Sequence, residues 1–251
     1  VQLLSDNAIE EPIVAITFDD GYQNNFDIVL PILEQEGLPA TIFLTTRFID
    51  TDSTIWTGLL QDAFTHTRAT ILEWRSNTYP LTTLKDRYES MWAVKFALKD
   101  NPQDTLFEEI HTLLESLGDG HGPALSAASP YRMLDSNSLT SLVNSDLIEL
   151  SAHTHSHYVL SRISPAAQHE EISTSLRHVE QVTGHTPLML GETAVAFRRR
   201  DLAQGTADPV DAIGDLLPAR RCRERGLELR QVRIEGFRSL DRKLRGPVRK
   251  L

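Results

Sequence analysis

Two short apolar runs, at residues 13–18 and 40–46, flank a stretch with helical spacing, and this pattern constrains the fold more than any other. Both runs contain β-branched and aromatic residues, which is typical of strands, and the first is apolar enough to be buried on both faces. Between them, Gly37 is placed to end a helix, and Pro31 predicts that this helix is kinked or begins late. The order strand, helix, strand predicts a βαβ unit, and therefore a parallel sheet with right-handed crossovers.

The next part of the chain, about residues 49–130, interrupts this alternation. Its clearest segments are two helical patterns, near residues 83–99 and 102–117. A third strand is expected only at residues 147–153, after a short helix at 137–144. We therefore expect an α/β fold with a helical insertion between the second and third strands. The insertion is expected to cap one end of the sheet and to border the groove in which a ligand would bind.

A well-marked helix follows the third strand. Ser164 is its expected N-cap, Pro165 lies in its first turn, and Gly184 is its expected stop. Beyond Pro187 the pattern of strands and helices is lost.

Charge and composition exclude several classes of protein. The 251 residues carry a net charge of −10, which argues against nucleic acid as a partner. The charge is uneven: residues 190–251 hold 15 Lys+Arg and 9 Asp+Glu, a net of +6, against −16 for residues 1–189. This change of sign predicts a boundary near residue 190, between a main domain (1–189) and a basic, Arg-rich C-terminal segment (190–251).

Localisation is constrained by what the chain lacks. Cys222 is the single cysteine, so no intramolecular disulfide can form, which fits a reducing compartment. No apolar run is long enough for a membrane span, and the N-terminal residues lack the basic start and apolar core of a signal peptide. The sequence as it stands predicts a cytoplasmic protein, or an extracellular or periplasmic one if a signal has been removed.

Two polar clusters are predicted to lie at the carboxyl ends of strands. Asp19 and Asp20 follow the first strand, and His153, His155 and His157 follow the third. Strand ends of a parallel sheet share one edge, where ligands bind, so we expect the clusters to meet. A helical turn would aim His153 and His157 in the same direction.

Two imidazoles and one carboxylate form a three-ligand site that leaves coordination positions open, as in catalytic divalent metal sites. The second carboxylate of the pair would then serve as a general base on a metal-activated water. Less specific interpretations stand beside this one: Asp-Asp-Gly at a strand end is often only a turn, and a run of histidines is often a surface feature. We interpret His155 as a supporting residue.

These two motifs resemble those of the polysaccharide deacetylases with the NodB-homology domain, carbohydrate esterase family 4. "TFDDG" at residues 17–21 is similar to the first motif of the family, and "HTHSH" at residues 153–157 is similar to its second motif. The flanking "PILEQEGLPATIFLTT" and "IELSAHTHSHYVLSRIS" also look like family sequence, and the resemblance covers about residues 13–187.

The resemblance implies a distorted (β/α) barrel of about seven parallel strands. It also implies removal of acetyl groups, chiefly N-acetyl, from sugars such as those of oligo- and polysaccharides. Carried over to this chain, Asp19 corresponds to the catalytic base, and Asp20, His153 and His157 correspond to the ligands of a divalent metal, usually zinc, with cobalt or nickel as alternatives.

The chain departs from the family pattern after "GHTPL". The third family motif has Arg, aromatic and Pro-Tyr-Gly character, but this chain reads "MLGETAVAFRRRD" there. The family supplies a late histidine as general acid, and the last histidine here is His185. We therefore expect an atypical or incomplete C-terminal part. An alternative function is a family member that binds metal or carbohydrate without efficient turnover, and a third is an unrelated α/β binding protein in which "FDDG" is only a turn.

Overall fold

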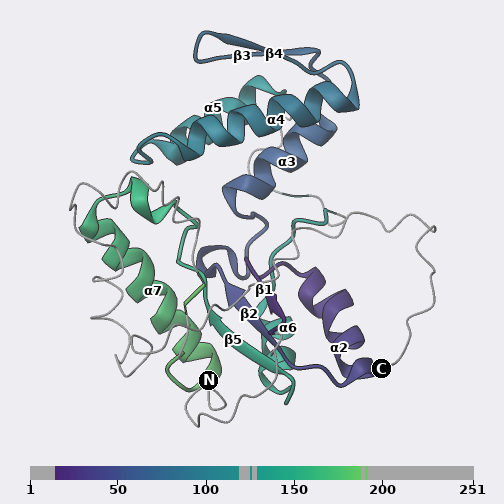
Figure 1. Cartoon of the computed structure of the whole chain (residues 1–251), viewed down its shortest axis with the longest axis vertical. Coiled ribbons are helices and arrows are strands. Elements are labelled where there is room, and N and C mark those ends of the chain that lie inside the picture. Colours follow the sequence, from purple (N-terminus) through teal and green to yellow (C-terminus); the bar gives the residue numbers. More distant parts are fainter. Residues whose placement is uncertain (1–14, 119–124, 126–128, 188–189, 192–251) are drawn as a thin grey trace, which may run out of the picture.

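The computed structural model describes residues 15–118, 125, 129–187 and 190–191. Its centre is a parallel sheet with the order β1-β2-β5 (Figure 1). The strands are β1 (Thr17–Phe18), β2 (Ala40–Leu44) and β5 (Ile148–Ala152). The predicted α/β class and parallel sheet are therefore confirmed, whereas a barrel of about seven strands is not confirmed by the described residues.

The register of the sheet brings the carboxyl ends of its strands together. Phe18 pairs with Ile42, and Leu44 pairs with Ala152. Ala152 also forms a parallel β-bridge with Leu190, so the chain returns to the sheet beside β5 after the last helix. The segments that leave β1, β2 and β5 consequently start from the same edge.

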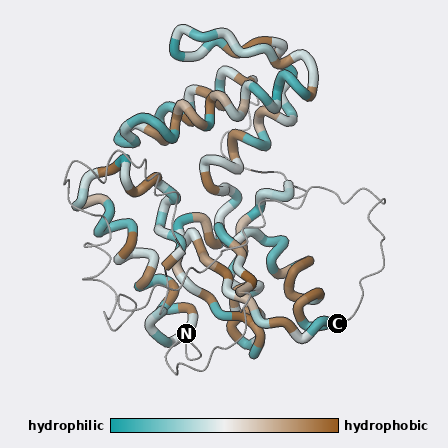
Figure 2. Tube along the Cα trace, viewed as in Figure 1, coloured by the Kyte–Doolittle hydropathy of each residue, from teal (hydrophilic) through white to brown (hydrophobic). Residues whose placement is uncertain are grey.

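Helices cover the sheet on the face that carries its alternate apolar residues. The helices are α2 (Leu30–Glu36), α6 (Ser136–Val143) and α7 (Pro165–Thr183), with short helical turns η1 (Asn25–Val29), η2 (Thr46–Phe48) and η3 (Leu160–Arg162). Ile42, Leu44 and Leu150 share one face because side chains alternate along a strand, and all three belong to a buried cluster with residues of these helices. Figure 2 shows this pattern as hydrophobic stretches on the strands and alternating hydropathy along α7.

The helix boundaries follow local chemistry. Ser164 caps α7 by accepting a hydrogen bond from the N–H of Ala167, and the helix ends at Gly184, which has a φ of 78°. Pro31 lies in the first turn of α2, and the preceding turn η1 is of the π type, so this helix does begin late. None of the described helices is long and apolar enough to cross a membrane.

The first strand differs from the expectation of burial on both faces. β1 contains only two described residues, and both are half-buried. The physical reason is its position, because β1 is an edge of the described sheet and pairs with β2 alone.

The insertion between β2 and β5 forms its own layer above the sheet (Figure 1). It contains α3 (Trp56–His66), β3 (Ile71–Trp74), β4 (Asn77–Pro80), α4 (Leu84–Lys99) and α5 (Leu106–Ser116). The two predicted helices correspond to α4 and α5, but the antiparallel hairpin of β3 and β4 was not predicted. The insertion has a separate buried core, built around large side chains such as Trp56, Phe64 and Leu72.

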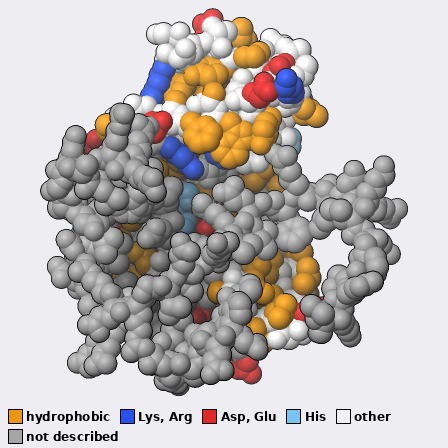
Figure 3. All heavy atoms as spheres, viewed as in Figure 1, with side chains coloured by type: hydrophobic (Ala, Val, Ile, Leu, Met, Phe, Trp, Pro, Cys, Tyr) orange, Lys and Arg blue, Asp and Glu red, His pale blue; other side chains and the backbone are white. Residues whose placement is uncertain are grey.

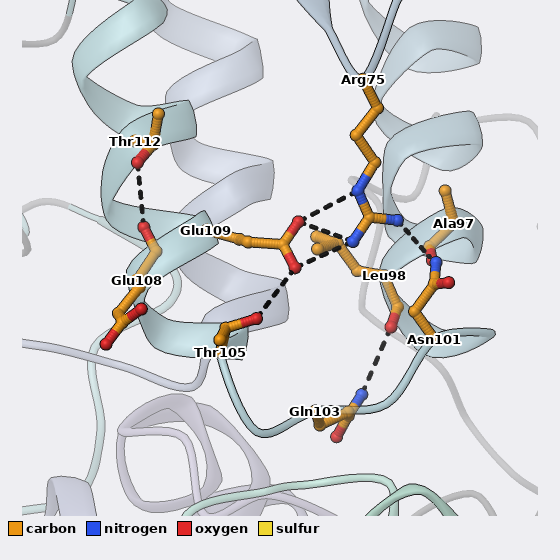
Figure 4. A network of polar contacts seen from close by, with 9 residues as sticks. All are labelled: Arg75, Ala97, Leu98, Asn101, Gln103, Thr105, Glu108, Glu109 and Thr112. Atoms are coloured by element: carbon orange, nitrogen blue, oxygen red, sulfur yellow. Dashed lines mark hydrogen bonds and ion pairs between the residues drawn. The ribbon is translucent and has the colours of Figure 1, made fainter.

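Polar contacts tie the hairpin to the helices of the insertion (Figure 4). The guanidinium of Arg75, at the hairpin turn, donates to both carboxylate oxygens of Glu109 on α5, with an ion-pair distance of 2.6 Å. Thr105 donates to the same carboxylate at 3.3 Å. Gln103 donates to the carbonyl of Leu98 at 3.5 Å, across the connection between α4 and α5.

One side of α4 exposes aromatic residues to solvent. Tyr88 and Phe96 are exposed, and both contact the ring of Trp92, with centroid distances of 6.1 Å and 5.4 Å. Figure 3 shows hydrophobic side chains gathered on this face of the insertion.

Candidate metal centre

The first half of the site is the turn that follows β1. Asp20 and Gly21 both have left-handed backbone conformations, with φ values of 76° and 81°. Gly21 also lies close to β2, because an added Cβ would lie 2.9 Å from Cδ2 of Leu44. A left-handed aspartate is sparsely populated, and such conformations concentrate at functional sites.

The second half is the segment after β5, residues 153–157, which we call the histidine loop. The expectation of a helical turn here is wrong, because the described backbone of the loop contains no helical residue. Instead, Thr154 and His157 have left-handed conformations, with φ values of 65° and 62°. These two residues turn the chain so that His153 and His157 both face the carboxylate of Asp20.

Three side chains converge between these two segments. Oδ1 of Asp20 lies 3.3 Å from Nε2 of His153 and 3.2 Å from Nε2 of His157. The imidazole centroids are 5.4 Å apart, and one ligand atom from each of the three residues lies within 4.8 Å of the others. The side chain of His153 is 1% exposed, that of His157 is 13% exposed and that of Asp20 is 20% exposed.

The donor atoms fit a divalent metal ion. A tetrahedral ion with bonds of about 2.0–2.1 Å places neighbouring ligand atoms about 3.3–3.4 Å apart, close to the two measured separations. Oδ1 of Asp20 and Nε2 of His153 are buried and have no hydrogen-bond partner. Buried polar atoms are normally satisfied, and a bound cation would satisfy both of these atoms. Two nitrogens and one oxygen suit zinc and leave a coordination position open.

The local electric field favours an ionised Asp20. Burial alone would raise the pKa of this carboxyl, but the neighbouring imidazoles of His157 and His153 hold it well below its usual range. Tyr22 is affected in the opposite sense. Burial, together with the negative charge of Asp20, raises the pKa of the Tyr22 phenol well above its usual value.

The other sequence candidates lie beside this group. Asp19 is half-buried and precedes Asp20, and its carboxylate is not one of the three converging groups. His155 is hydrogen-bonded through Nδ1 to the hydroxyl of Thr46 at 3.0 Å, in agreement with a supporting position. The third-motif segment from residue 192 onward and the expected position of a late general acid lie outside the described residues.

The end of β2 joins the two halves of the site, and this connection was missed by sequence reasoning. The N–H of Thr45 donates to the carbonyl of Asp20 at 3.1 Å, and its hydroxyl donates to the carbonyl of His153 at 3.2 Å. Thr46 and Arg47 continue the pairing, because their N–H groups donate to the carbonyls of Thr154 and His155. A polar Thr-Thr pair at the end of the middle strand was the available signal.

Three side chains from distant elements also hold the histidine loop and its continuation. The indole N–H of Trp56, on α3, donates to the carbonyl of His157 at 3.0 Å. Gln103, from the insertion, accepts a hydrogen bond from the N–H of Val159 at 2.7 Å. Glu171, on α7, accepts hydrogen bonds from the N–H groups of two loop residues. No local sequence pattern marks these residues, because their partners are backbone groups far along the chain.

Gly191 packs against the ring of His153. Its N–H donates to the carbonyl of Ala152 at 2.8 Å, which places its backbone beside the site. An added Cβ would lie 2.7 Å from Nδ1 of His153 and 2.7 Å from Cγ of Phe43, so glycine is required by close approach.

Comparison with known proteins places the chain among deacetylases. Residues 6–193 match the family profile described as polysaccharide deacetylase. The putative polysaccharide deacetylase YxkH of Bacillus subtilis (strain 168) is 41% identical over 49 residues, which cover 20% of this chain and 18% of that protein.

Two solved structures also align with this chain, each with a TM-score below 0.5. IcaB from Ammonifex degensii has a TM-score of 0.42 and 12% identity, over 83% of this chain and 58% of that one. The deacetylase PplD of Streptococcus pyogenes, in complex with acetate, has a TM-score of 0.35 and 16% identity, over 80% and 55%. The chain therefore spans less than two thirds of each of these relatives.

The profile match includes both the Asp-Asp-Gly turn and the histidine loop, and it confirms the resemblance to the NodB-homology, carbohydrate esterase family 4 proteins. The chain belongs to the polysaccharide deacetylase family, whose members are hydrolases that act on carbon–nitrogen bonds.

Proposed function

We propose that this protein is a metal-dependent hydrolase that removes acetyl groups, chiefly N-acetyl groups, from the sugars of an oligo- or polysaccharide. The proposed metal is zinc, with cobalt or nickel as functional substitutes. Asp20, His153 and His157 are the proposed ligands, and Asp19 is the proposed general base. The single observation that carries the proposal is the convergence of Asp20 Oδ1 with the two Nε2 atoms at 3.2–3.3 Å.

A divalent ion held by Asp20, His153 and His157 would supply a Lewis acid, able to polarise an acetyl carbonyl and to lower the pKa of water. The chain's own residues supply the rest. Asp19 accepts the proton of the attacking water as the new carbon–oxygen bond forms. The carbon–nitrogen bond then breaks, acetate is released, and the sugar amine takes up a proton from solvent.

The organisation of the chain is also part of the proposal. Residues 1–189 form the deacetylase domain, with a helical insertion at about 49–130, and residues 190–251 form a basic, Arg-rich C-terminal segment. The insertion is expected to affect substrate choice, since Trp56 and Gln103 connect it directly to the histidine loop and its continuation.

Elemental analysis of the purified protein is the first test. We expect about one divalent ion per wild-type chain and loss of that ion in the double variant His153→Ala/His157→Ala. The matched control is His66→Ala/His111→Ala, which removes two exposed helix histidines that contact Asp62 and Glu115 within their own helices. Absence of metal in the wild type after incubation with zinc would contradict the proposal.

Acetate release from N-acetylglucosamine oligomers tests the reaction itself. Asp19→Asn removes the proposed base, and loss of a general base lowers rates by about 10²–10⁴-fold. A wild-type protein that binds metal but releases no acetate would instead support the alternative of a member without efficient turnover.

A further inference from the structure

Glu171 is a buried carboxylate that faces the histidine loop. It lies on α7 and is only 8% exposed. Its Oε2 accepts hydrogen bonds from the N–H groups of His155, at 3.0 Å, and Ser156, at 2.6 Å. Burial of a charged group is costly unless it is paired or hydrogen-bonded. None of the ion pairs found within the described residues involves Glu171, so backbone donors are its identified partners.

The two donors are successive backbone N–H groups that follow a left-handed residue, Thr154. Such an arrangement forms a concave anion-binding site, and hydrogen bonds to a carboxylate are about twice as strong as neutral ones. Glu171 therefore binds two backbone groups of the loop, in the conformation that the loop adopts here. A loop with a different conformation would not present both N–H groups to one oxygen.

The histidine loop needs this support because its conformation is not an intrinsically favoured one. Thr154 and His157 both occupy the left-handed region, which is unfavourable for residues with a Cβ. The β2 side of the loop is held through its carbonyl groups by Thr45, Thr46 and Arg47. Glu171, on α7, instead binds N–H groups of the loop.

The two proposed metal ligands of the loop lie on either side of the residues that Glu171 holds. His153 is two residues before His155, and His157 directly follows Ser156. A change in the backbone of the middle residues would rotate the left-handed His157 and alter its 3.2 Å approach to Asp20.

We propose that Glu171 is a positioning residue of the metal centre, which sets the spacing of His153 and His157 by holding the backbone between them. This inference rests on the metal site proposed above. It goes beyond the proposed ligand set, because it makes the arrangement of the site depend on a carboxylate that is not one of the three proposed ligands. Groups that orient metal ligands typically change metal affinity by about 10–100-fold when they are lost.

The test compares metal affinity in Glu171→Ala, Glu171→Asp and Glu171→Gln, by competition with a chromophoric chelator for Zn²⁺ and by the visible absorption spectrum of bound Co²⁺. Alanine removes the acceptor, aspartate withdraws it by one methylene, and glutamine retains an acceptor oxygen at the same reach. We expect affinity to fall about 10–100-fold for alanine and aspartate, with a changed Co²⁺ spectrum, and to be largely restored for glutamine. Glu170→Gln is the matched control, because the Glu170 side chain on the same helix is 73% exposed.

A purely structural role would lower thermal stability without changing the affinity or the Co²⁺ spectrum of the folded fraction. Wild-type affinity and spectrum in Glu171→Asp would overturn the proposal, and this variant decides the matter if Glu171→Ala does not fold. Hydrogen exchange of the His155 and Ser156 amides provides a readout that needs no metal. If the wild type binds no metal, the proposed function fails, whereas the positioning role is still tested by faster exchange of these two amides in Glu171→Asp.

Discussion

The hydroxyl of Thr45 donates a hydrogen bond to the carbonyl of His153 at 3.2 Å, while the N–H of Thr45 donates to the carbonyl of Asp20 at 3.1 Å. One buried residue at the end of the middle strand thus connects the two segments that carry the converging side chains. These segments are more than a hundred residues apart in sequence, so their relative position depends on contacts of this kind.

Thr45→Val tests this connection with a substitution of nearly equal shape. The variant leaves the buried carbonyl of His153 without its hydroxyl donor, and an unsatisfied buried group costs about 1–3 kcal/mol. We expect the free energy of unfolding, measured with urea, to fall by that amount, and zinc affinity to fall as well. Thr82→Val, at an exposed position, is the control and should change neither quantity.

Trp56→Phe tests the contact between the insertion and the histidine loop. The substitution keeps an aromatic ring but removes the N–H that donates to the carbonyl of His157. We expect weaker zinc binding and a loss of stability above the roughly 1–3 kcal/mol of the lost hydrogen bond, since the carbonyl loses its donor and the smaller ring leaves a cavity at a fully buried position. Chelator competition and urea unfolding measure the two effects.

Trp92→Phe is the matched control for Trp56→Phe. The indole nitrogen of Trp92 is buried and has no hydrogen-bond partner, so its removal should leave zinc affinity unchanged and cost little stability. Equal effects of the two variants would show that the Trp56 hydrogen bond plays no part in holding the loop.

Gly191→Ala tests the close approach to His153. The added methyl would lie 2.7 Å from both His153 Nδ1 and Phe43 Cγ, and overpacking of this kind costs about 1–3 kcal/mol. We expect a lower melting temperature and a displaced imidazole, seen as weaker binding of Co²⁺. Gly191 is not among the glycines with a positive φ, so the expected loss comes from the close contacts and not from backbone strain.

Asp135 at the N-cap of α6 makes stability depend on pH. The hydrogen bond from the N–H of Ser138 lowers the pKa of the Asp135 carboxyl in the folded protein. A depressed folded-state pKa contributes stability that is fully present above the unfolded-state pKa of about 4 and is lost as pH falls through the folded-state value.

The prediction for Asp135 uses two variants and urea unfolding at pH 7 and pH 3. Asp135→Ala should lose about 1 kcal/mol at pH 7, whereas Asp135→Asn retains a cap and should lose less. The advantage of wild type over Asp135→Asn should shrink at pH 3. An advantage that stays constant between the two pH values would contradict the assignment, and Asp146→Asn, at an exposed position, controls for the loss of one surface charge.

The hairpin of the insertion illustrates where sequence reasoning fails. Its two-residue turn, Arg75 and Ser76, has φ values of 47° and 62°, as a type I′ turn requires. The usual sequence signal for such a turn is Asn-Gly or Asp-Gly. Arg-Ser carries no such signal, and the ion pair of Arg75 with Glu109 becomes visible only once the hairpin and α5 are packed together.

The sequence by itself determined the parallel βαβ arrangement and the edge at which Asp20, His153 and His157 lie. Apolar runs identify strands, and parallel strands necessarily bring their carboxyl ends to one side. The tertiary structure alone decided how the side chains are aimed. The left-handed conformations of Thr154 and His157 replace the expected helical turn, and they are held by Thr45, Trp56 and Glu171. Hydrogen bonds between backbone groups and side chains from distant segments follow no local periodicity, so only the packed structure reveals them.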